Sequence, residues 1–387
     1  MMSDKPEQTR GAHGRGALLD WFEARVNLTE FFALLTSLGL FYVEVDTKKP
    51  LRLAVREALA KPVSSYAEWP RVLGPLAVLF FLFQVVSGVL LAFYYRASPS
   101  EAYESIRFIL RDVNFGWLIH QTHRWGGQLL VAILILRIVR FFFGGVYKKP
   151  RELLWISGAL LLLLAMHADL TGRLLTWNQI SYWSTVRGAE LIFTLPLIGP
   201  LLGFLVGGQE IGAATLSRFY ILHILILPAA VFVLLYFNFA TVRRVGLTEA
   251  ASPTNVGGRR QYRDYLYNLA TLVVLIVGVL VSLAVIQPVP FYPEIDLLST
   301  PVEVQPPWYL LAPHVLVDVL LGRLPDLLKG TLFLASVVLL VLWPFVDRSP
   351  GKTMRERATV VTIGTLAFLL WVVLTIYGVA LQNIGAP

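Results

Sequence analysis

Seven long apolar runs divide this chain, and each is long enough to cross a hydrocarbon core about 30 Å thick. Inside a bilayer, backbone polar groups have no water to bond, so each run is expected to be a helix. With 56% hydrophobic and 15% charged residues, a soluble globular domain is excluded. The prediction is an all-α, polytopic membrane protein with spans at Val72–Tyr95, Trp117–Phe143, Leu153–Leu170, Phe219–Thr241, Tyr267–Ile286, Gly330–Phe345 and Val360–Leu381.

The net charge of +8 is concentrated in three loops, which argues against a nucleic-acid partner. These loops follow the second, fourth and sixth spans, so they lie on one side if the chain crosses at every span. By the positive-inside rule they are cytoplasmic, and the expected location is the cell inner membrane. The basic residues are Lys148, Lys149 and Arg151, then Arg243, Arg244, Arg259, Arg260 and Arg263, then Arg348, Lys352, Arg355 and Arg357.

Composition outside the spans suggests four regions. Residues 1–18 are polar and glycine-rich and are expected to form a flexible tail, and 19–44 an amphipathic helix on the membrane surface. A polar stretch near residue 251 separates a four-span region, 70–245, from a three-span region, 260–387.

Two segments between spans differ from ordinary solvated loops. The stretch Trp177–Arg218 predicts short helices along the surface, and the Pro-rich stretch Gln287–Lys329 is too polar to span and too apolar to be fully solvated. Irregular backbone of this kind near a membrane usually lines a pocket.

His123 and His223 begin two apolar helices at the same expected depth. Fourteen residues of α-helix rise about 21 Å and return to nearly the same face, so a second histidine fourteen residues later on each helix would allow two stacked hemes. Here Arg137 stands fourteen residues after His123, while Phe237 and Asn238 stand fourteen and fifteen after His223. One histidine pair is present, and the other is absent.

The first pair favours a heme, because a low-spin b heme takes two axial imidazoles. A single histidine in an apolar helix is more often a packing residue, but two at matching depth are not easily explained that way. Glycines spaced by fourteen residues support the heme, since a missing side chain lets a flat macrocycle approach; small residues also serve helix packing. These are Gly74 and Gly88 on the first span, and Gly158 and Gly172 on the third.

Several segments resemble cytochrome b of the bc- and chloroplast-type quinol oxidoreductases, in the seven-span form that fuses a four-helix heme protein with a three-helix partner. They occur in family order across roughly residues 19–385. The resemblance implies a four-helix heme b bundle plus three spans, a quinone or quinol ligand, lipid contacts, Rieske-type iron–sulfur or cytochrome c partners, and a homo- or heterodimer. The segments are DWFEARV, AFYYRAS, VNFGWLI, KKPREL, WNQISYW, SRFYILHILILP and STPVEVQPPWY.

The resemblance also suggests contacts to the heme propionates. Arg218 precedes His223 as in the family, where such an arginine faces a propionate; otherwise it is an interfacial anchor. His120 stands where the family usually has arginine, so it either makes the propionate contact or is an ordinary outer-surface histidine. Its register, about 60° from His123, makes it a weaker candidate ligand.

The inner pair cannot ligate iron, because a guanidinium has no available lone pair and asparagine is a poor ligand. A divergent member with one b heme is therefore predicted. An arginine within a span needs a partner or an exit. Arg137 either extends toward cytoplasmic water or fills part of the former heme cavity and bonds to Asn238.

The candidate quinone pocket comprises Pro306, Pro307, Trp308 and Tyr309, with His314 seven residues after Pro307. Family members often carry an acid at the second position, assigned to accept a quinol proton, and Pro307 cannot do this. His314 has a side chain suited to proton transfer near neutral pH, and Glu303 is near in sequence; a loop histidine without such a role is the alternative.

Two positions near these sites remain open at this stage. His167 and Asp169 are polar residues near the end of the third span, with no assignable role.

Two functions remain: a one-heme electron-transfer subunit of a quinol-dependent oxidoreductase complex without an ordinary Q cycle, or a degenerate, non-catalytic scaffold. Bound, redox-active heme would distinguish the first from the second.

Overall fold

The protein is described by a computed structural model at residues 28–35, 45–60, 62–63, 72–193, 195, 198–208, 210–245, 260–301, 304 and 306–384. These residues are almost entirely helical. The described strands are β1 (Pro62–Val63) and β2 (Arg260–Gln261), which pair antiparallel. Seven helices in the described part of the chain are long and apolar enough to span a membrane, so the predicted all-α, seven-span fold is confirmed.

The spans lie close to their predicted positions. The third extends to Leu174 rather than Leu170, because Asp169 and Arg173 form an i,i+4 ion pair that keeps both polar residues within the helix. The sixth begins at Asp326, directly after Pro325. The spans are α4 (Leu73–Ala92), α6 (Gly116–Phe143), α7 (Glu152–Leu174), the continuous α10 (Ala213–Ile221), η3 (Leu222–Ile226) and α11 (Leu227–Val245), then α12 (Tyr262–Ile286), α14 (Asp326–Val346) and α15 (Ala358–Ile384).

The chain divides into two compact units, and the smaller comprises Met1–Val78 and Ser252–Val274. It contains α2 (Leu28–Leu35), α3 (Leu51–Ala60), the strand pair and the beginnings of α4 and α12. Ala58 and Tyr262 form its buried core. Helix α2 is the described part of the predicted helix 19–44, whereas the predicted tail 1–18 lies outside the described residues.

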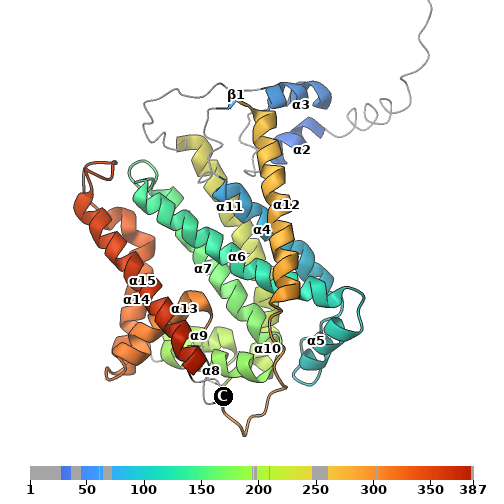
Figure 1. Cartoon of the computed structure of the whole chain (residues 1–387), viewed down its shortest axis with the longest axis vertical. Helices are drawn as coiled ribbons and strands as arrows, with labels where there is room; N and C mark the ends of the chain where they lie inside the picture. The colour runs from blue at the N-terminus through green and yellow to red at the C-terminus, as the bar shows by residue number, and fades with distance from the viewer. Residues whose placement is uncertain are drawn as a thin grey trace, which may run out of the picture. The chain divides into compact units, whose positions relative to one another are not determined.

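The larger unit is built around α7, which packs against α6, α11 and α14 (Figure 1). Beyond the C-terminal end of α7, Leu174, Trp177 and Leu216 form a second core. The short helices predicted after Trp177 are present as α8 (Gln179–Phe193) and α9 (Ile198–Val206), and α5 (Ala102–Arg111) packs beside α6. These connections anchor the end of the bundle where the histidines lie.

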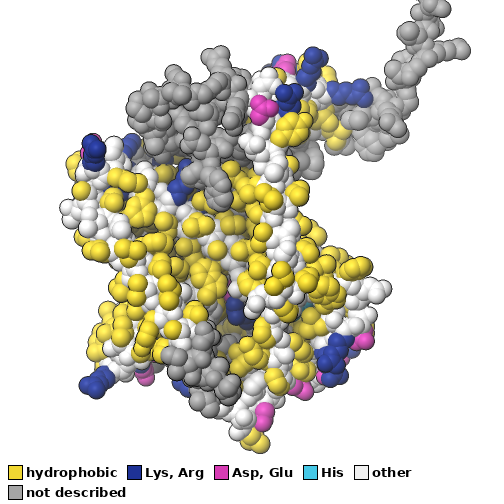
Figure 2. Space-filling model, viewed as in Figure 1, with side chains coloured by type: hydrophobic (Ala, Val, Ile, Leu, Met, Phe, Trp, Pro, Cys, Tyr) yellow, Lys and Arg dark blue, Asp and Glu magenta, His cyan; other side chains and the backbone are white. Residues whose placement is uncertain are grey.

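The last part of the larger unit begins with α13 (Trp308–His314) and the π-helix η4 (Val315–Leu320). Both pack against α15, around buried Ala312, Val315 and Leu374. The outward faces of α14 and α15 carry exposed apolar side chains such as Leu339 and Ile376, and Figure 2 shows hydrophobic side chains covering this region. Such faces suit contact with lipid.

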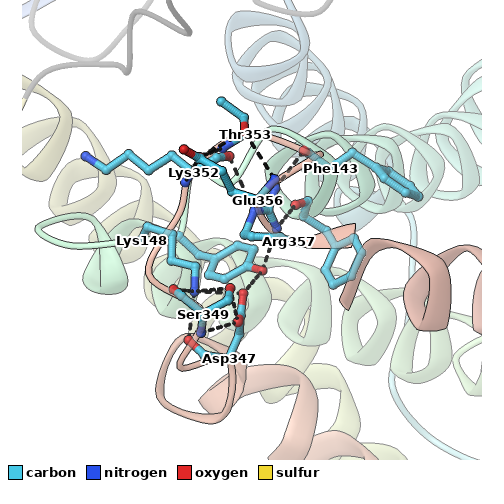
Figure 3. A network of polar contacts seen from close by, with 10 residues as sticks. Phe143, Lys148, Asp347, Ser349, Lys352, Thr353, Glu356 and Arg357 are labelled. Atoms are coloured by element: carbon cyan, nitrogen blue, oxygen red, sulfur yellow. Dashed lines mark hydrogen bonds and ion pairs between the residues drawn. The ribbon is translucent and has the colours of Figure 1, made fainter. Parts of the chain in front are cut away.

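A polar network joins the loop after α6 to the loop after α14 (Figure 3). The Asp347 carboxylate accepts a hydrogen bond from Tyr147 at 2.6 Å and pairs with Lys148 at 2.8 Å. Buried Arg357 donates to the Tyr147 oxygen at 2.8 Å and to the Phe143 carbonyl at 2.9 Å. The network thus connects segments two hundred residues apart.

Candidate functional site

His123 lies in α6 and His223 in η3, and their imidazole rings face each other with centroids 6.2 Å apart and planes inclined by 74°. Imidazole nitrogens bind metal ions at about 2.0–2.1 Å, so one iron shared by both rings would hold their centres about 6 Å apart. The observed spacing fits an iron atom between the rings.

Hydrogen bonds orient both rings through the same nitrogen. His123 Nδ1 lies 2.8 Å from the Ser87 hydroxyl oxygen, which itself donates to the Phe83 carbonyl. His223 Nδ1 lies 3.0 Å from the Ala168 carbonyl, which can only accept, so this nitrogen carries the proton. Each ring thereby keeps Nε2 available as a ligand, as is usual where a second hydrogen bond sets the tautomer of a metal-binding histidine.

Glycines stand directly behind both rings. A Cβ added at Gly88 would lie 3.2 Å from His123 Cε1, and one added at Gly172 would lie 2.6 Å from His223 Cε1. Among the described residues, no atom lies within 4 Å of the Cβ position at Gly74. The first two glycines therefore give the imidazoles the room that their orientation requires.

His223 lies in a π-turn, an irregularity often found at functional sites. Pro228 has no N–H to donate to the carbonyl four residues earlier, and Leu227 N–H instead bonds to the Leu222 carbonyl, five residues back. The turn adds one residue to the spacing, so position fifteen rather than fourteen shares the inward face. Accordingly Asn238 is buried, at 2% exposure, and Phe237 is exposed at 42%.

At the inner level, Arg137 and Asn238 bond to each other. Arg137 Nη2 donates to Asn238 Oδ1 at 2.8 Å, and Asn238 Nδ2 donates to Ser157 Oγ at 2.7 Å. Arg137 is 7% exposed and its guanidinium lies over the Phe141 ring at 4.7 Å. Of the two arrangements expected for Arg137, the structure has the bonded, buried one, not the one that reaches toward water. Its Nη1 lies 3.4 Å from the Cβ position at Gly158, so the guanidinium occupies the space that glycine leaves.

The two candidate propionate residues differ. Arg218 is exposed, donates to the Phe204 carbonyl and lies over the Phe204 ring. His120 is buried rather than at the outer surface, and its Nδ1 has no hydrogen-bond partner among the described residues. Gln84 Nε2, which faces Gly126 one turn beyond His123, also has none in this part of the chain. Two buried polar atoms without partners fit a polar group of a ligand beside His123.

In the candidate quinone segment, Pro307 precedes α13, and Trp308 and Tyr309 begin it. Tyr309 is 2% exposed and donates to the Asp169 carboxylate at 2.8 Å. Burial and the charge of Asp169 raise the pKa of the Tyr309 phenol, so it remains protonated at neutral pH. The structure thus brings Tyr309 to the C-terminal end of α7.

Within the described structure, the remaining residues expected in this pocket make no hydrogen bond or ion pair with Asp169. His314 Nδ1 bonds to exposed Asp318 at 2.8 Å. Pro306 is half-buried before α13, and Glu303 lies outside the described residues. Three charged residues lie together with Tyr309: Asp169, Arg173 and, through longer-range electrostatic interaction, Arg124. The sequence analysis noted Asp169 without a role and missed the other two. The i,i+4 spacing of Asp169 and Arg173 was the one local sign.

The histidine pair suits a heme better than a bare metal ion. No group of three or more His, Cys, Asp or Glu side chains that could hold an ion occurs among the described residues. Structural zinc sites need four protein ligands and catalytic ones three, whereas heme iron needs only two axial ligands. Ring spacing, free Nε2 atoms, supporting glycines and unpartnered buried polar atoms all fit this group.

Comparison with known proteins gives the family. The model of the family "Cytochrome b/b6/petB" matches residues 58–246, and that of "Cytochrome b(C-terminal)/b6/petD" matches residues 294–384. A cytochrome bc complex cytochrome b subunit of Chlorobaculum thiosulfatiphilum is 33% identical over 303 residues, 77% of this chain and 71% of that protein. The chain belongs to the cytochrome b/b6 family. It is therefore a multi-pass membrane protein of electron transport that binds heme b.

Two further relatives cover different parts of this cytochrome b. Cytochrome b6 of Heliomicrobium gestii is 41% identical over 178 residues, which is 46% of this chain and 84% of that protein. A chain of a hyperthermophilic respiratory complex III superposes with a TM-score of 0.75 and 26% identity, covering 93% of this chain and 91% of that one. The fold of nearly the whole chain is thus shared with a solved structure.

Proposed function

We propose that this cytochrome b is the heme-carrying subunit of a bc-type quinol oxidoreductase complex, with a single b heme held by His123 and His223. Both imidazoles make their hydrogen bonds through Nδ1, which leaves each Nε2 available, and their centroids lie 6.2 Å apart. His120, buried and unpartnered at Nδ1 among the described residues, is proposed to meet a propionate. Arg218 would have to leave the Phe204 carbonyl to make the same contact.

The observation that carries the single-heme proposal is the bond between Arg137 and Asn238. Neither side chain can ligate iron, and together with Ser157 they satisfy one another within the bundle. A bifurcated quinol cycle sends one electron inward through two b hemes. With one heme, that electron would cross most of the membrane unaided, so an ordinary Q cycle is not expected.

The bound heme would supply a one-electron redox centre beside an outer quinone pocket formed by Ser299–Val315. The proposed partners are Rieske-type iron–sulfur or cytochrome c subunits, since one relative is named as a subunit of a cytochrome bc complex. The proposed setting is the cell inner membrane with the basic loops on the cytoplasmic side. The protein would pass electrons between quinol and these partners by a modified route.

Counting hemes in the purified, assembled protein tests this proposal. We expect one noncovalent b heme per chain, and His223→Ala should abolish its low-spin spectrum because one axial ligand is lost. His167→Ala is the matched control, since His167 is exposed on α7 and bonds only a backbone carbonyl. Two b hemes per native chain would refute the proposal, and a heme-free protein with intact assembly would support the scaffold instead.

A further inference from the structure

A buried charged cluster lies at the C-terminal end of α7, where the quinone segment meets the heme bundle. Oδ2 of Asp169 accepts hydrogen bonds from Arg173 Nε at 2.7 Å and from the Tyr309 hydroxyl at 2.8 Å. The Asp169 side chain is 6% exposed and that of Arg173 24%. Ionisable groups inside a membrane span are costly, so their presence indicates a functional site.

The other carboxylate oxygen of Asp169 remains available. Oδ1 makes no hydrogen bond with any described residue, and it lies 3.9 Å from the Cβ position of Gly127, where α6 has no side chain. Ionised carboxylates accept several hydrogen bonds, and Oδ1 is not one of the fully buried side-chain atoms that lack a partner. This oxygen therefore has the capacity and the space for a donor from a ligand.

Arg124 completes the electrostatics of the cluster. It interacts with Asp169, Arg173 and Tyr309 but makes no hydrogen bond or ion pair with a side chain in the described part of the chain. Two guanidinium groups and one carboxylate leave one net positive charge. This charge favours a ligand whose oxygen carries partial negative charge.

We propose that Asp169 is the carboxylate of the outer quinone pocket, with Oδ1 accepting a hydrogen bond from a quinol hydroxyl and Oδ2 holding Tyr309 and Arg173 in position. The proposal rests on the quinone pocket of the proposed function. Pro307 stands at the position where the family often carries an acid, so the proposal assigns the acidic group of the pocket to a residue of α7 instead. His314 does not take this place, because it bonds Asp318 on the exposed side of the following turn.

The chemistry of the ligand gives a sharp test, because a quinol hydroxyl donates a hydrogen bond and a quinone carbonyl cannot. In Asp169→Asn the amide oxygen would keep accepting hydrogen bonds from Arg173 and Tyr309. The amide nitrogen would then face the ligand as a hydrogen-bond donor. We expect roughly tenfold weaker quinol binding, the loss of one hydrogen bond to a charged group, while quinone affinity should be unchanged or higher, because a quinone carbonyl can accept from the new amide donor.

The measurement uses the assembled protein with its heme. Short-chain benzo- and naphthoquinones are titrated against the oxidised heme spectrum, and the matching quinols are titrated anaerobically against the reduced one. Asp326→Asn is the matched control, because its carboxylate is 66% exposed and pairs only with Lys329 in the described structure. This control should bind both ligand forms as the native protein does.

A second measurement needs no variant. The dimethyl ether of the same quinol keeps the ring but has no hydroxyl donor, so we expect it to bind native protein roughly tenfold more weakly than the quinol. Equal binding of quinol and ether would overturn the role of Asp169 while leaving the quinone pocket in place. Equal weakening of quinol and quinone by Asp169→Asn would also overturn it, as a structural effect. If native protein bound neither form, the proposed function itself would fail.

Discussion

At the scale of single residues, Arg137 and Asn238 stand fourteen and fifteen residues after the histidines, at the level of a second heme. Arg137→His combined with Asn238→His should raise heme content above one per chain, incompletely, because both ligands return and the guanidinium leaves the space beside Gly158. Each single change should add much less. Pyridine hemochrome assay per chain measures the result.

The matched control for this prediction is Arg137→Met with Asn238→Leu, which removes the same polar groups without supplying ligands. It should add no heme. If both double variants gained equal heme, cavity shape rather than ligation would limit binding at this level, and if neither gained any, neighbouring side chains would have closed the cavity.

The residues that sequence alone could predict are those defined by spacing along one helix. Helical periodicity predicts the histidine pair and the loss of the inner ligands. It also predicts, as one of two alternatives, that Arg137 lies close to Asn238. The bond from Tyr309 to Asp169 joins positions 140 residues apart. No local pattern encodes it, since it depends on α13 docking against α7.

At the scale of elements, the π-turn η3 sets which residue of α11 faces inward with His223. Deleting Leu225, an exposed residue of this turn, should restore regular α-helix and place Asn238 fourteen residues after His223, on nearly the same face of a regular helix. Heme content should be largely retained, because His223 and the inner face still both point into the bundle. The heme-to-protein ratio and the low-spin spectrum check this.

Deleting Leu225 together with Ala229 of α11 is the contrasting variant, because Asn238 then follows His223 by thirteen residues and turns about 100° away from that face, so heme content should fall sharply. Loss of heme after the Leu225 deletion alone, or full retention in the double deletion, would contradict a register role for the turn. The sequence located each span from its apolar length, but the period of an ideal helix could not predict a π-turn. Pro228 was the one sign of it, since a proline inside a helix can also produce a simple kink.

At the scale of the whole chain, the network of Tyr147, Lys148, Asp347 and Arg357 fastens the heme-binding helices to the last two spans (Figure 3). The apolar pattern predicted both groups of spans but not this connection, because the basic residues of these loops were interpreted only as orientation signals. Lys148 and Arg357 are instead largely buried and engaged with the opposite loop.

Asp347→Asn tests that connection. Burial disfavours the charge, but hydrogen bonds from Lys148, Ser349 and Tyr147 outweigh it and lower the pKa of the Asp347 carboxyl below its usual value. Burial and the bond to Asp347 likewise raise the pKa of Tyr147 to about 12. At neutral pH the variant should lose about 3 kcal/mol, the usual cost of breaking a buried pair, seen as a lower thermal midpoint and faster tryptic cleavage after Lys352.

The sign of the pH dependence follows from the lowered pKa. Stabilisation by a carboxylate is fully present above its unfolded pKa and is lost as pH falls through the folded value. The native protein and Asp347→Asn should therefore differ at pH 7, still differ near pH 4 and converge only in stronger acid. The exposed Asp326→Asn should match the native protein throughout. A difference that persisted undiminished in strong acid would show that packing, not the charge of Asp347, holds the two loops together.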